Sequence, residues 1–263
     1  MADRVRIPVI CGPTGSGKTA VALTLARSFP IEIVSADSRQ IIKHLNIGTA
    51  KPTVEEQGQV RFHLIDLVEP GERYSAFRFL EDADQAITQI IRAGRRPLVV
   101  GGTGLYLKAL ADGVIEIEQD RPEIRDELEK QMAELGPEAM HKLLSEIDPV
   151  EAARIHPRNR VRVIRALEIH RLTGRSKSEL LASGAYKKSG YDYEFFCLTP
   201  DRQVLYENID RRVDQMMRQG LLEEVDDLLA RGLESALRRA NVIGYEELLD
   251  HGDGRCTLEE AVR

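Results

Sequence analysis

The feature that most constrains the fold is a glycine-rich segment near the start of the chain, Gly12-Pro-Thr-Gly-Ser-Gly-Lys-Thr19. It matches the phosphate-loop pattern GxxxxGK[ST], follows the apolar run 6–11 and opens a helical pattern that begins at Thr19. The glycines let backbone N–H groups surround a phosphate, and the following helix adds its positive dipole end. Lys18 can reach terminal phosphates, and Thr19 can offer its hydroxyl to Mg²⁺. The complete motif therefore predicts a phosphorylated ligand, in preference to a glycine turn that only caps a helix.

Strand and helix patterns alternate over the first hundred or so residues. Apolar runs predict strands at 31–35, 63–68 and 97–100, and an amphipathic pattern predicts a long helix over 75–92. Strands that alternate with helices form parallel sheets covered on both faces. We therefore predict an α/β fold, a P-loop-type parallel sheet with helices on both faces.

The character of the chain changes after Asp120. Residues 121–183 contain no strand pattern, and their helical patterns are interrupted by glycine and proline at 136–137, 149, 157 and 174. A strand returns at 194–198, with helices from 201 onward. We predict a helical insertion domain at 121–191 within a catalytic core formed by 1–120 and 192–263.

Composition limits the compartment and the partners. No apolar run in the 263 residues approaches the ~20 that a membrane helix needs. The N-terminus leads directly into a strand pattern, which leaves no room for a signal peptide, so we expect a cytoplasmic protein. Three widely separated cysteines without a CxxC pair indicate neither a disulfide framework nor a zinc site. The net charge of -6 disfavours nonspecific binding to polyanions but permits a local basic surface.

The ligand of the phosphate loop does not look like ATP. A P-loop NTPase usually carries an acidic residue for magnesium at the end of an apolar strand. Here the strand pattern 97–100 ends in Gly101-Gly102, and Asp66 is a weaker candidate for that role. The missing acid is a first indication against ordinary ATP chemistry.

Two further strand ends carry candidate site residues. Asp37 follows the strand 31–35 at the sheet edge where ligands of parallel sheets bind, so it is either a general base or the N-cap of a helix near Ser38. The second glycine turn, Gly101-Gly-Thr-Gly-Leu-Tyr106, can offer backbone N–H groups to a substrate. It can equally be a strand-to-helix turn that needs glycine for positive φ, and without other information that interpretation is favoured.

The segment 152–175 is rich in arginine, and it predicts a helix with Pro157 in its first turn and Gly174 as its C-terminal cap. Arg158, Arg162 and Arg165 recur at i, i+4 and i+7 and should share one face. A solvated face, with Glu168 paired to Arg165, is the ordinary explanation of such a run. Because the charges of this run are predominantly positive in a protein that is acidic as a whole, we favour contact with the phosphates of a nucleic-acid backbone.

Together these motifs resemble the tRNA dimethylallyltransferase family. The resemblance rests on GPTGSGKT at 12–19, SADSRQ at 35–40, NIGTAKP at 46–52, HLID at 63–66, GGTGLYLKAL at 101–110 and RVIRALEI at 162–169. It implies transfer of a dimethylallyl group from dimethylallyl diphosphate to N6 of the adenine immediately 3′ of the anticodon, with Mg²⁺ and release of diphosphate. It also implies that the insertion domain grips the anticodon stem-loop. No membrane and no obligate protein partner are expected.

The resemblance also implies roles for individual residues. Asp37 would be the base, assisted by Lys18 and Thr19, and Thr19 would also contact the metal. The diphosphate would be bound by Gly12, Pro13, Thr14, Gly15, Ser16, Gly17, Lys18 and Thr19. The tRNA would be contacted by Asp37, Ser38, Arg39, Gln40, Thr103, Arg125, Val161, Arg162, Val163, Ile164 and Arg165.

Two other classes of protein remain as alternatives. A small-molecule or nucleotide kinase would share the phosphate loop, although the missing acid and the arginine run argue against it. A noncatalytic RNA-binding switch would bind RNA in a nucleotide-dependent way and produce no modified base. Family members also usually continue for some forty residues beyond the position of Arg263, so we expect the chain to be truncated.

Overall fold

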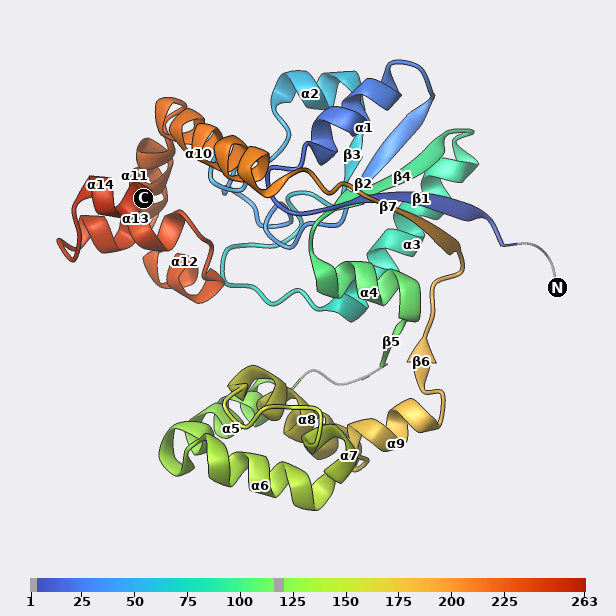
Figure 1. Cartoon of the computed structure of the whole chain (residues 1–263), viewed down its shortest axis with the longest axis vertical. Helices are drawn as coiled ribbons and strands as arrows, with labels where there is room; N and C mark the ends of the chain where they lie inside the picture. Colours follow the sequence, from blue (N-terminus) through green and yellow to red (C-terminus); the bar gives the residue numbers. More distant parts are fainter. Residues whose placement is uncertain (1–3, 116–120) are drawn as a thin grey trace. The chain divides into compact units, whose positions relative to one another are not determined.

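The computed structural model describes residues 4–115 and 121–263. The chain divides into two compact units, the first formed by Met1–Asp112 with Ser189–Arg263 and the second by Gly113–Lys188 (Figure 1). We call them the sheet unit and the helical unit. Within the described ranges, no helix is both long and apolar enough to cross a membrane.

The sheet unit is built on five strands in the order β3-β2-β4-β1-β7 (Figure 1). All neighbouring strands pair in parallel, as the alternating pattern predicted. The apolar runs form the central strands because β-branched side chains pack well on a surface buried on both faces. The bounds are β1 Arg6–Cys11, β2 Ile31–Ser35, β3 Phe62–His63, β4 Arg96–Gly101 and β7 Asp192–Cys197.

Helices cover both faces of this sheet (Figure 1). The connection from β1 to β2 crosses the sheet in one direction, and those from β3 to β4 and from β4 to β7 cross it in the other. Because such crossovers are right-handed, the first connection lies on one face and the other two on the opposite face. The helices are α1 Lys18–Ala26 and α2 Val54–Gln59 on the first face, and α3 Ala76–Arg92 and α4 Gly104–Asp112 on the second.

The directions of these connections locate the ligand crevice. The chain leaves adjacent strands β1 and β4 toward opposite faces, which makes their carboxyl ends a topological switch point. Open parallel sheets bind their ligands in the crevice at such a point. The phosphate loop follows β1, and the second glycine turn follows β4.

The predicted strand 63–68 is wrong in length. Only Phe62 and His63 pair with β2, because Leu64 and Asp66 have positive φ values of 61° and 55°. A residue with positive φ cannot continue a strand, and each such residue turns the chain. Val68 forms an isolated parallel bridge with Ile42, outside the named strands.

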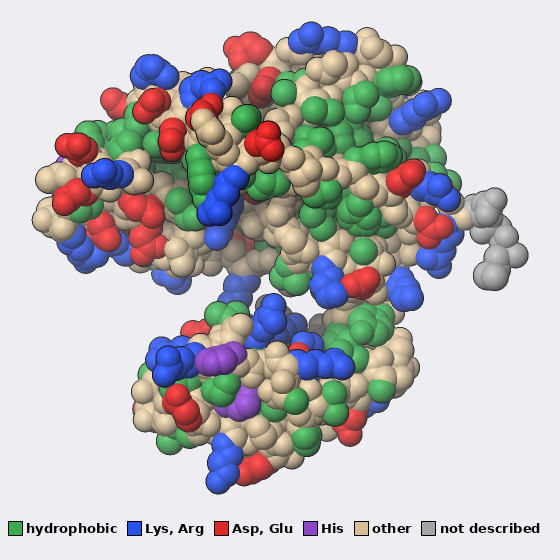
Figure 2. Space-filling view, viewed as in Figure 1, with side chains coloured by type: hydrophobic (Ala, Val, Ile, Leu, Met, Phe, Trp, Pro, Cys, Tyr) green, Lys and Arg blue, Asp and Glu red, His purple; other side chains and the backbone are tan. Residues whose placement is uncertain are grey.

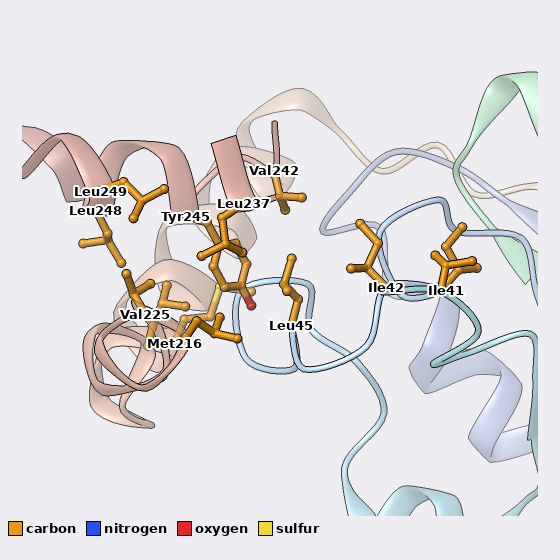
Figure 3. Packing of buried hydrophobic residues seen from close by; sticks show 13 residues of the cluster. Ile41, Ile42, Leu45, Met216, Val225, Leu237, Val242, Tyr245, Leu248 and Leu249 are labelled. Carbon is orange, nitrogen blue, oxygen red and sulfur yellow. The ribbon is translucent and has the colours of Figure 1, made fainter. Parts of the chain in front are cut away.

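The remaining helices of the sheet unit pack around a segment between β2 and α2. Leu45 lies among Met216, Tyr245 and other buried side chains of these helices (Figure 3). The Tyr245 ring passes so close to Gly48 that a Cβ there would lie 2.5 Å from its Cε2 atom. The helices are α10 Arg202–Arg218, α11 Leu221–Ala230, α12 Glu234–Ala240, α13 Tyr245–Gly252 and α14 Leu258–Val262.

The helical unit has its own core. Buried residues of α5, α6 and α8, among them Leu128, Met140 and Val163, form one apolar cluster. In its described part, residues 113–115 and 121–188, the only strands are a short antiparallel pair, β5 and β6. The elements are β5 Val114–Ile115, α5 Pro122–Leu135, α6 Pro137–Ile147, α7 Pro149–Ala152, α8 Arg160–Thr173, α9 Lys177–Ala182 and β6 Tyr186–Lys187.

The arginine-rich helix is shorter than the sequence predicted. It begins after Asn159, whose side chain accepts a hydrogen bond from the Arg162 amide, and ends at Gly174 with φ 69°. Pro157 and Arg158 therefore lie in the preceding turn and not in the first helical turn. The predicted cap at Gly174 is confirmed, but Arg158 does not share a helical face with Arg162 and Arg165.

Candidate active site

The phosphate loop closes around the side chain of its own lysine. Gly15 and Gly17 have positive φ values of 79° and 86°, which glycine adopts at low cost and which turn the loop inward. The Lys18 ammonium donates hydrogen bonds to the carbonyl oxygens of Gly12 at 2.9 Å and Pro13 at 2.7 Å. The loop is thus formed with a cation at its centre, where a phosphate group would be neutralised.

One buried polar atom in this loop lacks a partner. The Ser16 hydroxyl oxygen is inaccessible to solvent and makes no hydrogen bond to any described residue. A buried hydroxyl without a hydrogen bond is destabilising, and native structures contain few of them. A phosphate oxygen in the loop is the kind of acceptor that would satisfy it.

Asp37 lies at the carboxyl end of β2, next to β4, and its carboxylate organises a turn. One oxygen, Oδ1, accepts hydrogen bonds from the backbone amides of Arg39 at 2.9 Å and Gln40 at 3.4 Å. Residues 38–41 form turns and no helix begins there. The prediction that Asp37 is the N-cap of a helix is therefore wrong. The carboxylate instead caps a turn, and its second oxygen is not engaged in that capping.

The turn that holds Asp37 is fixed from several sides. The Thr103 hydroxyl accepts from the Ser38 amide at 2.9 Å and donates to the Ser38 hydroxyl at 3.2 Å. The Gln40 side chain accepts from the Ser35 hydroxyl at 3.1 Å and donates to the Ala50 carbonyl at 3.0 Å. These bonds join the predicted residues Asp37, Ser38, Gln40 and Thr103 into one rigid assembly at the edge of the sheet.

Arg39 belongs to the same turn but points away from this assembly. Its side chain is exposed, and its guanidinium donates to the Ala240 carbonyl oxygen at 2.8 Å. The contact ties the turn to the segment that follows α12. Of the four residues 37–40, Arg39 is the one with an exposed side chain.

The second glycine turn is required by close backbone contacts. A Cβ at Gly101 would lie 2.1 Å from the Ala36 carbonyl oxygen, and one at Gly102 would lie 3.0 Å from the Gly12 carbonyl oxygen. Neither glycine has a positive φ, so the alternative favoured from the sequence, glycine for left-handed backbone, is wrong at both positions. Because glycine has no side chain, the end of β4 can instead pack closely against Ala36 and Gly12 and lie next to Lys18.

Two site residues on α10 carried no signal in the sequence. The Asn208 side chain donates to the Gly15 carbonyl oxygen at 3.0 Å, which places α10 directly over the phosphate loop. One turn later on the same helix lies Arg212, whose side chain is half-buried. Its charge interacts with those of both Asp37 and Lys18. A polar helix that repeats arginines gives no local indication of which one is turned inward.

The charges of these three groups are coupled. Burial lowers the pKa of the Lys18 ammonium, the Asp37 carboxylate opposes that shift, and the Arg212 cation adds to it. Burial likewise lowers the pKa of the Arg212 guanidinium, again opposed by Asp37. Two half-buried cations near each other favour an anionic ligand between them, because such a ligand offsets both their mutual repulsion and their partly lost hydration.

A buried tyrosine, Tyr106, lies near enough to Asp37 for its charge to act on it. Tyr106 stacks on Phe79 with ring centroids 4.1 Å apart and meets Tyr74 edge-on at 6.2 Å. Burial, with a contribution from the Asp37 charge, raises the pKa of Tyr106 to about 12. Its phenol therefore stays protonated and is unsuited to act as a base near neutral pH.

The predicted tRNA-contacting residues of the helical unit do not share one surface. Val163 and Ile164 are buried in the core of that unit, whereas Val161 and Arg162 are exposed. Arg125 and Arg165 meet at the Glu168 carboxylate, at 3.6 and 2.7 Å respectively. Lysine and arginine side chains gather on the helical unit on the face seen in Figure 2.

The residues present fit a magnesium ion that is bound mainly by its substrate. Among the described residues, no three His, Cys, Asp or Glu side chains come together to form a metal site. Thr19 is half-buried in the first turn of α1, beside the loop, and can supply one hydroxyl oxygen. Mg²⁺ commonly takes few protein ligands and completes its octahedron with phosphate oxygens and water.

A phosphate loop at the switch point of a parallel sheet, with two cations and a carboxylate above it, defines a P-loop-type protein. Such a site suits a reaction in which charge develops on a diphosphate or triphosphate. The missing acid at the end of β4 separates it from ordinary ATP-hydrolysing members of that class.

Comparison with known proteins identifies the family. The model of the IPP transferase family matches residues 40–263, and that of isopentenyl transferases matches residues 5–69. The chain is 44% identical to tRNA dimethylallyltransferase 1 of Syntrophotalea carbinolica, over 99% of this chain and 83% of that protein. It is 48% identical to the tRNA dimethylallyltransferase of Anaeromyxobacter dehalogenans strain 2CP-1, over 98% of this chain and 84% of that protein.

Solved structures agree with this relationship. The tRNA isopentenylpyrophosphate transferase of Bacillus halodurans matches with a TM-score of 0.64 and 42% identity, over 98% of this chain and 80% of that one. A eukaryotic dimethylallyltransferase acting on tRNA matches with a TM-score of 0.82 and 30% identity, over 98% and 65%. The chain therefore belongs to the IPP transferase family of tRNA dimethylallyltransferases, and the resemblance seen in its motifs is confirmed.

Proposed function

We propose that this protein transfers a dimethylallyl group from dimethylallyl diphosphate to N6 of the adenine immediately 3′ of the anticodon in tRNA, and releases diphosphate. Its relatives are tRNA dimethylallyltransferases, and tRNA is accordingly its substrate class. The observation that carries the assignment to this site is the grouping of Lys18, Arg212 and Asp37 over the phosphate loop. The reaction would take place in the cytoplasm, where tRNA is modified.

The cations act on the leaving group. As the bond between the allylic carbon and the diphosphate oxygen breaks, its electron pair remains on the diphosphate and negative charge increases there. In our proposal Lys18, Arg212 and backbone N–H groups of the phosphate loop stabilise this charge, because the fold already holds them beside the diphosphate position. Diphosphate is thereby made a better leaving group at the moment of transfer.

Asp37 acts on the nucleophile. The lone pair of the adenine amine is delocalised into the ring, so N6 attacks well only if it loses a proton as the new N–C bond forms. The Asp37 oxygen that does not cap the turn is available to accept that proton. The turn fixes the carboxylate, because Thr103 and Gln40 hold residues 38–40 in place.

Magnesium, when bound, would supply further positive charge to the leaving diphosphate. In our proposal the Thr19 hydroxyl would help to hold this ion beside the diphosphate. Thr19 then contributes to the orientation of the diphosphate in the loop, next to Lys18.

We assign tRNA binding to both units. In the sheet unit, exposed Arg39 is the member of the turn 37–40 best suited to reach a phosphate. In the insertion domain, for which we propose the bounds 121–191 predicted from the sequence, Arg125, Arg162 and Arg165 are the basic candidates. The buried Val163 and Ile164 would support α8 from inside and would not themselves face RNA.

The decisive experiment is incubation of the protein with labelled dimethylallyl diphosphate and unmodified tRNA in the presence of magnesium. The expected product is tRNA with label on the adenine that follows the anticodon, identified by nuclease digestion and mass spectrometry. ATP consumption with a small acceptor and no tRNA would indicate the kinase instead. Nucleotide-dependent RNA affinity without a modified base would indicate the noncatalytic switch.

A further inference from the structure

Two cysteines far apart in the sequence lie directly opposite each other at the phosphate loop. Cys11 is the last residue of β1 and Cys197 the last of β7, and the two are register partners in the parallel pair. The backbone beyond them is also joined, since the Leu198 amide donates to the Cys11 carbonyl oxygen at 2.8 Å. Partners in a parallel pair project their side chains to the same face, so the two thiols lie next to each other on one face of the sheet.

The spacing of the strands suits a covalent bond between the two sulfur atoms. Neighbouring strands lie about 4.7–4.9 Å apart, and disulfides join residues whose Cα atoms are about 4.4–6.8 Å apart. Small shifts at the strand ends can therefore bring the sulfurs together. The third cysteine, Cys256, is not part of this pair, because its thiol donates to the Glu247 carbonyl oxygen.

The two thiols differ in their access to solvent. Cys11 is buried between β4 and β7, whereas Cys197 is exposed on an edge strand of the sheet. Burial, together with the neighbouring Cys197 thiol, raises the pKa of the Cys11 thiol, and the nearby Lys18 charge opposes this shift. Cys197 is accordingly the thiol that an oxidant reaches first, and Cys11 is placed to act second.

We propose that Cys11 and Cys197 form an oxidation site for low-molecular-weight disulfides such as glutathione disulfide, and that their bonding lowers the affinity of the adjacent phosphate loop. The Cys197 thiolate attacks one sulfur of the oxidant, the oxidant's S–S bond breaks, and one small thiol leaves as a thiolate. The Cys11 thiolate then attacks the Cys197 sulfur and expels the second small thiol. The two cysteine protons balance the two released thiolates, so the oxidant is reduced as the protein pair is oxidised.

The loop is sensitive to this bond because its first residue has no room to move toward β7. Gly12 directly follows Cys11, and a Cβ placed on it would already lie 2.7 Å from the Leu198 carbonyl oxygen. The Gly12 carbonyl oxygen also holds the Lys18 ammonium at 2.9 Å. Drawing the ends of β1 and β7 together would therefore displace both Gly12 and the lysine that depends on it.

The expected size of the effect follows from this displacement. A shift of about 1 Å at a binding group can reduce function by about 10²-fold, so we expect a loss of diphosphate affinity of at least about tenfold. Strained disulfides have higher reduction potentials than relaxed ones, so the bond should be readily reversed by dithiothreitol.

The test uses the whole chain, first fully reduced and then treated with glutathione disulfide. Peptide mapping by mass spectrometry detects the link, and calorimetry with inorganic diphosphate and magnesium measures affinity before oxidation, after it, and after addition of dithiothreitol. Cys197→Ser removes the pair, and Cys256→Ser is the matched control that retains it. We expect the wild type and Cys256→Ser to gain an 11–197 link and to lose affinity reversibly, while Cys197→Ser keeps its affinity throughout.

Several results would overturn the proposal. They are the absence of an 11–197 link in the folded wild type, a mixed disulfide at Cys197 that never resolves, and a complete link with unchanged affinity. The affinity measurement rests on the proposed diphosphate site, but the mapping does not. A reduced protein that fails to bind diphosphate at all would therefore count against the proposed function, whereas binding without a link counts against the oxidation site.

Discussion

Substitution of Asp37 by asparagine would separate its chemical role from its structural one. The turn depends on Oδ1, which accepts from the Arg39 amide at 2.9 Å and the Gln40 amide at 3.4 Å. Asparagine keeps an oxygen at that position, and it caps backbone amides about as well as aspartate. The substitution replaces the other oxygen with an NH₂ group, which cannot accept the N6 proton. The fold should therefore persist while proton transfer is lost.

The expected magnitude follows from these two roles. A positioned general base contributes about 10²- to 10⁴-fold to the rate, so Asp37→Asn should slow alkyl transfer by a factor in that range. Diphosphate affinity should not weaken, because the lost charge is negative and lies near Lys18 and Arg212. The free energy of unfolding should change little. Asp37→Ala is the matched control, since it also removes the turn acceptor and should cost about 1 kcal/mol of stability.

The assay is single-turnover transfer with saturating tRNA and labelled dimethylallyl diphosphate, which isolates the chemical step from product release. Thermal unfolding and diphosphate calorimetry of the same proteins check the fold and the loop. If Asp37→Asn transfers within a few-fold of the wild-type rate while Asp37→Ala is slow, the residue only shapes the turn. That result would refute the assignment of Asp37 as the base but would leave the transferase function standing.

Three other substitutions test the remaining parts of the site. Lys18→Ala should severely weaken diphosphate binding in calorimetry with magnesium, and retained affinity would count against the phosphate-loop assignment. Arg212→Met should lower kcat by about 10²- to 10³-fold, because a preorganised cation is lost. An unchanged kcat would show that Arg212 does not act on the leaving group. Gly101→Ala should destabilise the fold by about 1–3 kcal/mol, because its Cβ would lie 2.1 Å from the Ala36 carbonyl oxygen. Gly104→Ala, which meets no atom within 4 Å, is the control and should unfold at the wild-type temperature.

The sequence predicted those parts of the fold that local patterns determine. β1, β2 and β4 are apolar runs bounded by turn residues, and α3 is an amphipathic helix whose N-cap is Ser75. The phosphate loop could also be predicted, because its motif determines both the backbone conformation and the kind of ligand that it binds. The end of β3 was not predictable in this way. Positive φ at Leu64 and Asp66 is imposed by the loop that they enter, and neither residue type signals it alone.

The candidate site was predictable only where one segment supplies several residues. Arg212 comes from a helix almost two hundred residues after the loop, and nothing in its neighbourhood distinguishes it from Arg211. The Cys11–Cys197 pair likewise depends on the register of β7 against β1, which the spacing of the cysteines does not reveal. Residues brought together by sheet order can be paired only once that order is known, and the strand patterns alone do not determine it.

The basic helix offers a final prediction, because Arg162 and Arg165 are both exposed but differ in their surroundings. Arg165 donates to Glu168 at 2.7 Å, and that carboxylate is only 3% exposed. Among the residues that the structure describes, Arg162 is exposed and has no ion pair. Arg165 thus has a structural role within the helical unit that Arg162 does not share.

The two alanine variants should therefore differ in their effect on stability. Arg162→Ala should leave the free energy of unfolding unchanged and lower the slope of log K against log salt for tRNA by about one unit, as expected for one lost phosphate contact. Arg165→Ala should in addition destabilise the helical unit by about 1–3 kcal/mol, because it leaves the buried Glu168 with only Arg125 at 3.6 Å. Salt-dependent binding and thermal unfolding of both variants measure the two effects, with diphosphate affinity as the control that neither should change. An unaltered salt slope in Arg162→Ala would mean that this face of α8 is only solvated, and tRNA binding by the helical unit would then have to rest on other residues.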